Sequence, residues 1–115
     1  MLLRADALRQ VGLFDEQRFF MYWEDTDLGF RLRARGWTLA VAPQSRVWHR
    51  LSASLGQGSA QLDAYFMRSA VRFLRLHAPC PPLAITSLAS TLLLKRILLG
   101  HWHRVLAVWQ GLRSA

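Results

Sequence analysis

The longest regular pattern in the chain is an amphipathic segment from about Ala60 to Leu76, which ends before Pro79. At 100° per residue its apolar side chains fall within an arc of about 120°, and its arginines lie on the opposite side. We therefore expect one long helix that buries a single face against the rest of the protein. The apolar side chains are Leu62, Phe66, Ala70, Phe73 and Leu74, and the arginines are Arg68, Arg72 and Arg75.

The positive charge of the chain lies almost entirely in its second half. The 115 residues carry a formal net charge of +8, yet residues 1–66 are nearly balanced, with eight Arg against seven Asp and Glu. Residues 67–115 contain seven Arg and Lys and no acid. With 52% hydrophobic residues, this composition excludes a disordered chain and an evenly basic, histone-like protein. The single cysteine, Cys80, excludes an internal disulfide framework and a Cys-cluster zinc site.

Shorter helices and strands are expected on both sides of the long helix. In the segment 24–36 acids stand at the front and arginines at the back, which matches the helix dipole, and Gly36 ends it. Pro43 ends an apolar run typical of a strand. The expected elements are helices over 7–11 (capped by Asp6, ended by Gly12) and 24–36, strands over 37–42 and 46–49, and a helix or helix pair over 83–112.

Three carboxylates, Glu24, Asp25 and Asp27, stand within four positions at a predicted helix start, directly after the aromatic run FFMYW. One interpretation is capping and compensation of the helix dipole, with Arg31 as a structural ion-pair partner of the acids. The other is chemical: backbone N–H groups at a helix start keep a carboxylate ionised, and aromatic walls restrict water around it. Such a carboxylate can take a proton from a hydroxyl group.

The motif around these acids is specific. The run G-x-F-D-E, then F-F-x-Y-x-E-D-x-D-L-x-x-R-x-x-x-x-G-W, then a proline and V-x-H, extends from Gly12 to His49. It resembles the acceptor half of family 2 glycosyltransferases, nearest to the bacterial rhamnosyltransferase-like and galactofuranosyltransferase-like branches. The resemblance covers residues 1 to about 78 and is only compositional beyond them.

The resemblance implies the fold class α/β: a C-terminal fragment of a GT-A nucleotide-sugar transferase fold, followed by a mainly helical tail. Residues 1–78 would form the acceptor-side part of the domain, with the donor-binding half absent, and residues 79–115 the basic, apolar tail. Because the donor half normally holds the nucleotide, the isolated chain is expected to be inactive.

The resemblance also implies a reaction: transfer of a sugar, with inversion, from a nucleotide-sugar donor to a glycan or polyprenyl-linked acceptor. By position Asp25 is the catalytic base, and Glu24 and Asp27 orient the acceptor or hold the helix start. His49 lies where some relatives bind the divalent metal, Mg²⁺ or Mn²⁺, whose other ligands would lie mostly in the absent half. A plain helix cap at Asp25 and a metal-free histidine at the end of a strand are the alternatives. The other residues given substrate-binding roles are Trp23, Trp48, Arg50 and Ser54.

The acid-free tail, with Trp102 and Trp109, suits an interfacial segment on an anionic membrane leaflet. Its longest uncharged apolar run, residues 83–94, is shorter than the roughly 20 residues that span a bilayer. We therefore expect a cytoplasmic protein, peripheral on the inner face of the cell membrane. The alternatives are a tail helix that packs on the missing half, a non-catalytic membrane-surface or regulatory fragment, and, with least support, a nucleic-acid binder, since no nucleic-acid motif is present.

Overall fold

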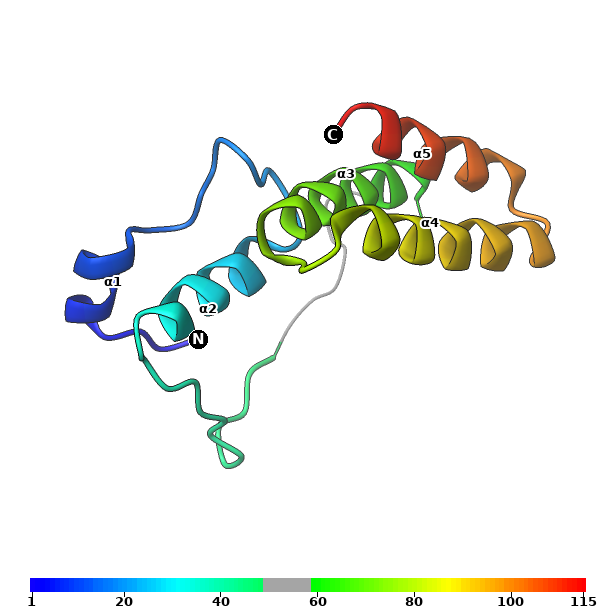
Figure 1. Ribbon diagram of the computed structural model, residues 1–115. Coiled ribbons are helices and arrows are strands. Elements are labelled where there is room, and N and C mark those ends of the chain that lie inside the picture. The colour runs from blue at the N-terminus through cyan, green and yellow to red at the C-terminus, as the bar shows by residue number, and fades with distance from the viewer. Residues whose placement is uncertain (49–58) are drawn as a thin grey trace.

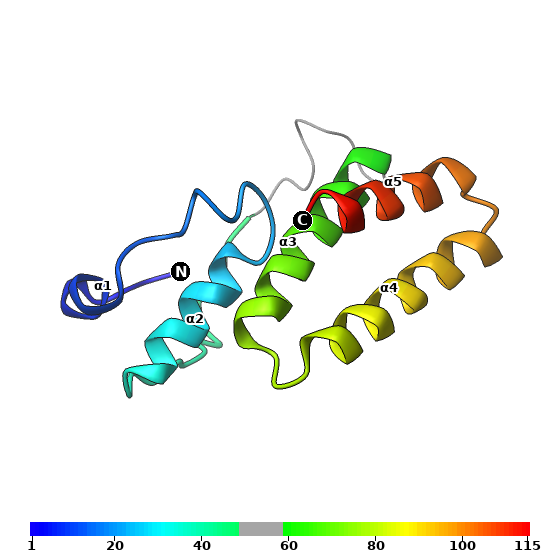
Figure 2. The ribbon, with the colours of Figure 1, turned by 45° about the horizontal axis from the view of Figure 1, so that its top comes forward.

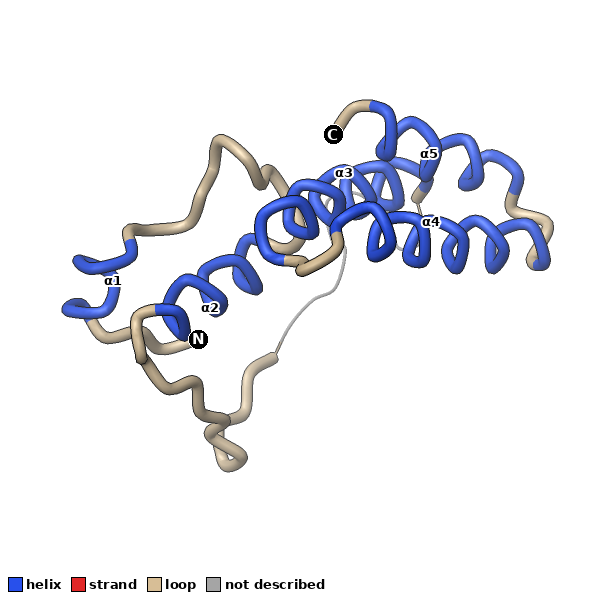
Figure 3. The backbone as a smooth tube through the Cα atoms, viewed as in Figure 1, coloured by secondary structure: helices blue, strands red, loops and turns tan. Residues whose placement is uncertain are grey.

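The structure is a computed structural model that describes residues 1–48 and 59–115, and all of its regular secondary structure in those ranges is α-helical (Figures 1 and 3). The helices expected over 24–36, 60–76 and 83–112 are confirmed, and their ends differ from the predicted ones by no more than two residues. The last of them is a pair of helices. The helices are α1 (Ala5–Val11), α2 (Glu24–Ala34), α3 (Ala60–His77), α4 (Pro81–Leu98) and α5 (Trp102–Arg113).

The predicted α/β class and the GT-A fold are wrong for the described residues, because no strand occurs in 1–48 or 59–115. The segment 37–42 and residues 46–48 are irregular, although their composition favours strands. A strand is held by hydrogen bonds to a neighbouring strand, and β-propensity alone does not create one. In the described part of the chain no second extended segment pairs with either of these two.

Helix α3 lies at the centre of the molecule, between α2 and the hairpin of α4 and α5 (Figure 2). One flank packs Met67 and Val71 against Ala89 of α4 and Val108 of α5, and all four side chains are buried. The other flank receives aromatic rings from α2 and from the loop that precedes it. The expected single buried face is therefore only part of what α3 buries.

The backbones of α3 and α5 approach each other closely at Gly111. A Cβ atom at this position would lie 2.4 Å from the carbonyl oxygen of Ala64 and 3.0 Å from Cβ of Met67. Only a residue without a side chain allows the two backbones to approach so closely. The glycine therefore sets the separation of α3 and α5.

A buried ion cluster joins the three helices at the other end of α5. The carboxylate of Asp63 on α3 accepts two hydrogen bonds from Arg96 on α4, at 3.0 and 2.8 Å, and two from Arg104 on α5, at 2.7 and 2.9 Å. Burial raises the pKa of Asp63, but hydrogen bonds and charge from Arg104 and Arg96 outweigh it, so the pKa lies below its usual value. The sequence pattern gave no sign of this cluster, because Asp63 looks like an ordinary first-turn acid.

Helices α1 and α2 form a second, smaller core. Ala7 packs with Leu28 and Leu32, which confirms the expected buried face of α2. The predicted cap of α1 is wrong by two residues: Arg4 is the N-cap, and Asp6 lies in the first turn, where it pairs with Arg9. Both helices are followed by a glycine with positive φ, +81° at Gly12 and +83° at Gly36, as expected from the sequence.

Candidate functional site

The start of α2, where the three acids stand, is held in place by an unusual backbone. Tyr22 and Trp23 both have left-handed φ values, 66° and 70°, a conformation that costs about 1–3 kcal/mol for each non-glycine residue. Packing on α3 compensates. The Tyr22 and Trp23 rings lie 5.7 and 5.6 Å from Phe66, and the Trp23 ring lies 4.8 Å from Phe73. The helix start is therefore fixed against the side of α3.

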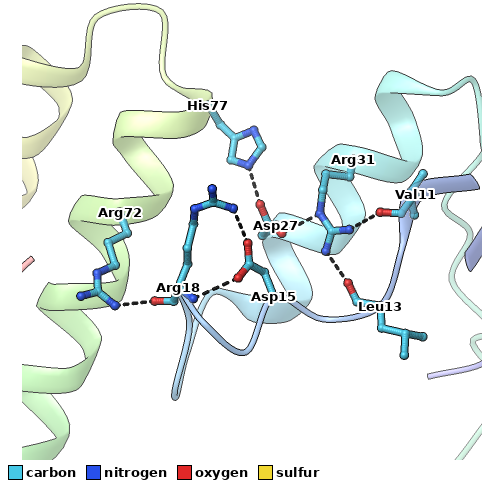
Figure 4. Close-up of polar contacts among 8 residues, drawn as sticks. All are labelled: Val11, Leu13, Asp15, Arg18, Asp27, Arg31, Arg72 and His77. Atoms are coloured by element: carbon cyan, nitrogen blue, oxygen red, sulfur yellow. Dashed lines mark hydrogen bonds and ion pairs between the residues drawn. The ribbon is translucent and has the colours of Figure 1, made fainter.

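Asp27 joins three segments of the chain (Figure 4). Its carboxylate is buried, with Oδ1 at 2.7 Å from Nε2 of His77 on α3 and Oδ2 accepting a 2.7 Å bond from Nε of Arg31. Arg31 also donates to the carbonyl oxygens of Val11, at 2.6 Å, and Leu13, at 2.8 Å. The predicted pairing of Arg31 with the acids is confirmed. Both oxygens of Asp27 are engaged, which favours its second predicted role, holding the helix start.

The loop before α2 is tied to α3 by polar contacts of the same kind. Arg72 donates to the carbonyl oxygen of Arg18 at 2.7 Å (Figure 4), and the Ser69 hydroxyl donates to that of Met21 at 2.7 Å. Asp15 accepts from the backbone and the guanidinium of Arg18. Slight burial raises the pKa of Asp15, but the hydrogen bonds and the charge of Arg18 outweigh this effect. The pKa of Asp15 therefore lies below its usual value. This loop is thus an ordered support for the acids.

Asp25 differs from Asp27 in being exposed. Its Oδ1 accepts 2.7 Å and 3.2 Å bonds from the backbone N–H and the hydroxyl of Thr26. No hydrogen bond to Oδ2 occurs in the part of the chain that the structure describes. Asp25 is among the residues that line an open cavity of about 870 Å³ between the start of the chain, α2 and residues 37–45.

The cavity beside Asp25 is mostly apolar. Most of its lining residues are aliphatic, with Trp37 as the one aromatic residue and Arg4, Asp25, Thr38 and Ser45 as the polar ones. The aromatic run FFMYW does not contribute, because most of those rings pack on α3. The prediction that this run forms an aromatic wall around the acid is therefore wrong for this cavity. The apolar side chains that line it include Leu3, Leu28, Leu32, Trp37, Leu39 and Val41.

The remaining predicted site residues fall into three groups. Glu24 and Trp23 are half-buried, and their Oε2 and Nε1 atoms are buried with no hydrogen-bond partner among residues 1–48 and 59–115. Trp48 is 97% exposed and does not line the cavity. His49, Arg50 and Ser54 lie outside the described residues, so their roles stay predictions.

Two further observations concern metal binding and the histidine that pairs with Asp27. In the two described stretches, no cluster of three His, Cys, Asp or Glu side chains is arranged to hold a metal ion. Sequence reasoning did not single out His77, the α3 partner of Asp27. Its signal was present, since His77 follows Phe73 by four positions and so lies on the same apolar arc of the helix.

Comparisons with known proteins place these residues in a family context. The family model described as "Glycosyltransferase like family 2" matches residues 1–70. An N-acetylglucosaminyl-diphospho-decaprenol L-rhamnosyltransferase of Mycobacterium tuberculosis, in strains CDC 1551 / Oshkosh and ATCC 25618 / H37Rv, is 43% identical over 74 residues. The match covers 64% of this chain and 24% of the relative, so the chain spans about a quarter of the length of these relatives. No solved structure matches the chain.

Proposed function

Because the chain belongs to the glycosyltransferase-like family 2, we propose that it supplies the acceptor side of a transferase that moves a sugar from a nucleotide-sugar donor to a glycan or lipid-linked acceptor. By analogy with the mycobacterial relatives, the sugar is L-rhamnose and the acceptor an N-acetylglucosaminyl-diphospho-polyprenol. The observation that carries the proposal is the position of Asp25: among the three acids at the start of α2 it is the exposed one, and it lines an open cavity.

The proposed reaction is a single displacement with inversion at the anomeric carbon. The acceptor hydroxyl gives its proton to the Asp25 carboxylate while its oxygen forms a bond to that carbon. The bond between the same carbon and the diphosphate oxygen breaks, and the nucleoside diphosphate leaves with the electron pair. Asp25 suits the role because it lies in the first turn of α2, where the helix dipole favours a negative charge, and its Oδ2 is not engaged by the described residues.

The neighbouring acids then have separate roles. Asp27 positions the helix through His77 and Arg31 and does not contact the substrate. We propose that the unpartnered Oε2 of Glu24 and Nε1 of Trp23 are satisfied when the site is complete, since buried polar atoms without partners are costly. Trp48, Arg50 and Ser54 are proposed as substrate contacts on the family resemblance alone.

The involvement of Mg²⁺ or Mn²⁺, with His49 as one ligand, is likewise proposed from the resemblance. The described residues provide no ligand cluster. A lipid-linked acceptor would bring the enzyme to the inner face of a membrane. In the ranges that the structure describes, none of the helices has the length and apolar character required to cross a bilayer.

Two measurements test the reaction. The purified chain is incubated with nucleotide-activated L-rhamnose and the lipid acceptor, and we expect no transfer from the chain alone. A chimera is then made in which residues 1–78 replace the corresponding segment of the mycobacterial rhamnosyltransferase. Asp25→Asn in this chimera is expected to lower kcat by about 10²- to 10⁴-fold, the usual contribution of a general base, with little change in KM.

The matched control is Asp6→Asn, which changes another exposed aspartate that does not line the cavity. It should leave kcat within about twofold. If the Asp25→Asn chimera kept its rate, or if Asp6→Asn lowered kcat as much, Asp25 would not be the base.

A further inference from the structure

The hairpin of α4 and α5 carries large apolar side chains that no described part of the chain covers. Six of these residues, called here the hairpin face, extend from the second half of α4 through the turn and along α5. Their side chains are between 49% and 76% exposed. Figures 1 and 2 show the turn of this hairpin projecting at the end of the molecule opposite α1. The residues are Leu94, Leu98, Leu99, Trp102, Leu106 and Trp109.

On α5 the exposed residues form one stripe along the helix. Trp102, Leu106, Trp109 and Arg113 recur at intervals of three and four residues, so they share one side of α5. The opposite side, with Val108 and Gly111, is buried against α3.

Two arginines within the hairpin are withdrawn from this surface. Arg96 and Arg104 turn inward to Asp63, and their side chains are only 14% exposed. The exposed cations, Lys95 and Arg113, lie beside the apolar residues on α4 and at the end of the α5 stripe. The hairpin face is thus apolar with cationic neighbours, the pattern of a helix that lies in a membrane interface, where tryptophan is enriched.

An apolar face of this kind suits a lipid surface, a second copy of the chain or the absent half of the domain, and the charge of the tail (residues 79–115) favours the lipid surface over a second copy. The exposed cations on α4 and α5 are Lys95 and Arg113, and residues 79–115 contain no Asp or Glu. Two such tails would repel each other, whereas anionic lipid headgroups attract juxtamembrane Lys and Arg. We propose that the hairpin face binds the surface of an anionic bilayer, with Trp102 and Leu106 inserted at the level of the headgroups. The binding depends only on α4 and α5, so it rests on the proposed function solely for its use in reaching a lipid-linked acceptor.

The test is flotation of the purified chain with lipid vesicles, which needs no catalytic activity. We expect binding to vesicles of equal parts phosphatidylglycerol and phosphatidylcholine to be about tenfold or more tighter than to phosphatidylcholine alone. Salt at about 1 M, where the Debye length is roughly 3 Å, should remove this difference. Leu106→Ser should weaken binding about tenfold, the effect of losing one buried leucine side chain.

The control is Leu13→Ser, because Leu13 is 71% exposed, close to the 63% of Leu106, and lies far from the hairpin in sequence. It should bind as the unaltered chain does. If circular dichroism shows that Leu106→Ser has lost helix, Trp102→Ser, also at a 63% exposed position, takes its place under the same criteria.

Three results would overturn the proposal. The first is no binding to either vesicle, and the second is an equal loss in Leu13→Ser. The third is concentration-dependent dimerisation that Leu106→Ser abolishes, without vesicle binding, which would assign the face to a second copy. Any of them leaves the transferase proposal standing, because that depends on Asp25 and on the assay of sugar transfer.

Discussion

The buried cluster around Asp63 provides the most demanding test of how this fold is held together. In the variant Asp63→Asn, one carboxylate oxygen becomes an amide nitrogen that cannot accept a hydrogen bond. The four bonds of 2.7–3.0 Å from Arg96 and Arg104 then lose both their strongest acceptor and its charge. Two guanidinium groups would remain largely buried at the junction of α3, α4 and α5, without a counter-charge.

The expected cost follows from this burial. Removing one partner of a buried ion pair typically costs about 3–5 kcal/mol, because an uncompensated charge remains in a poorly solvated place. Small domains are stable by only about 5–15 kcal/mol. Asp63→Asn should therefore lower the free energy of unfolding by a large part of the total, and urea titration followed by circular dichroism at 222 nm measures it.

Asp6→Asn is the matched control, since Asp6 also lies in the first turn of a helix and also pairs with an arginine, but at the surface. Exposed pairs contribute less than about 1 kcal/mol. A triple variant, Asp63→Leu with Arg96→Met and Arg104→Leu, should recover most of the lost stability, because hydrophobic replacement of a whole buried cluster is often neutral or better. The reasoning is refuted if Asp63→Asn costs no more than Asp6→Asn.

Two further predictions concern stability. Asp63 and Asp15 both have pKa values below normal in the folded protein, so their contribution is complete above the unfolded pKa of about 3.9 and is lost as pH falls through the lower folded values. The free energy of unfolding should thus decline as the pH falls below about 4, and it should decline less steeply in Asp63→Asn. Urea titrations at several pH values measure this, and the same pH dependence in the variant and the unaltered chain would contradict the prediction. Gly111→Ala should lower the free energy of unfolding by about 1–3 kcal/mol through overpacking against Ala64, whereas Gln110→Ala, at an exposed neighbour, should have little effect; equal values for the two would exclude a close contact there.

The sequence predicted the helices better than the arrangement between them. Gly12 and Gly36 mark helix ends because local backbone geometry requires glycine there, and this requirement is visible without a structure. The strand predicted over 37–42 failed because a strand depends on a distant partner. The α3 pattern was incomplete for a related reason: Met67 and Val71 lie beyond the edge of the apolar arc, and α4 and α5 bury them.

At the candidate site, too, the features that depend on local spacing were predictable, and those that depend on distant residues were not. The acidic run and its arginine partner were predictable from their spacing on one helix, since Asp27 and Arg31 are four residues apart. The contrast between a buried Asp27 and an exposed Asp25 was not, because it depends on His77, fifty positions away in the sequence. Nor did the sequence foresee that most of the aromatic run would pack on α3 instead of lining the cavity.

The absence of a side chain at Gly111 also determines the rotational setting of α5. If the helix turned about its own axis, a neighbouring side chain would enter the space against Ala64 that only a hydrogen atom now occupies. One orientation is therefore permitted, and it is the one that directs Trp102 and Leu106 away from α3. Moving the glycine one position along the sequence would rotate the helix by about 100° and carry the tryptophans round toward its neighbours. A single hydrogen in the interior thus decides what the outer surface of the last helix offers to its surroundings.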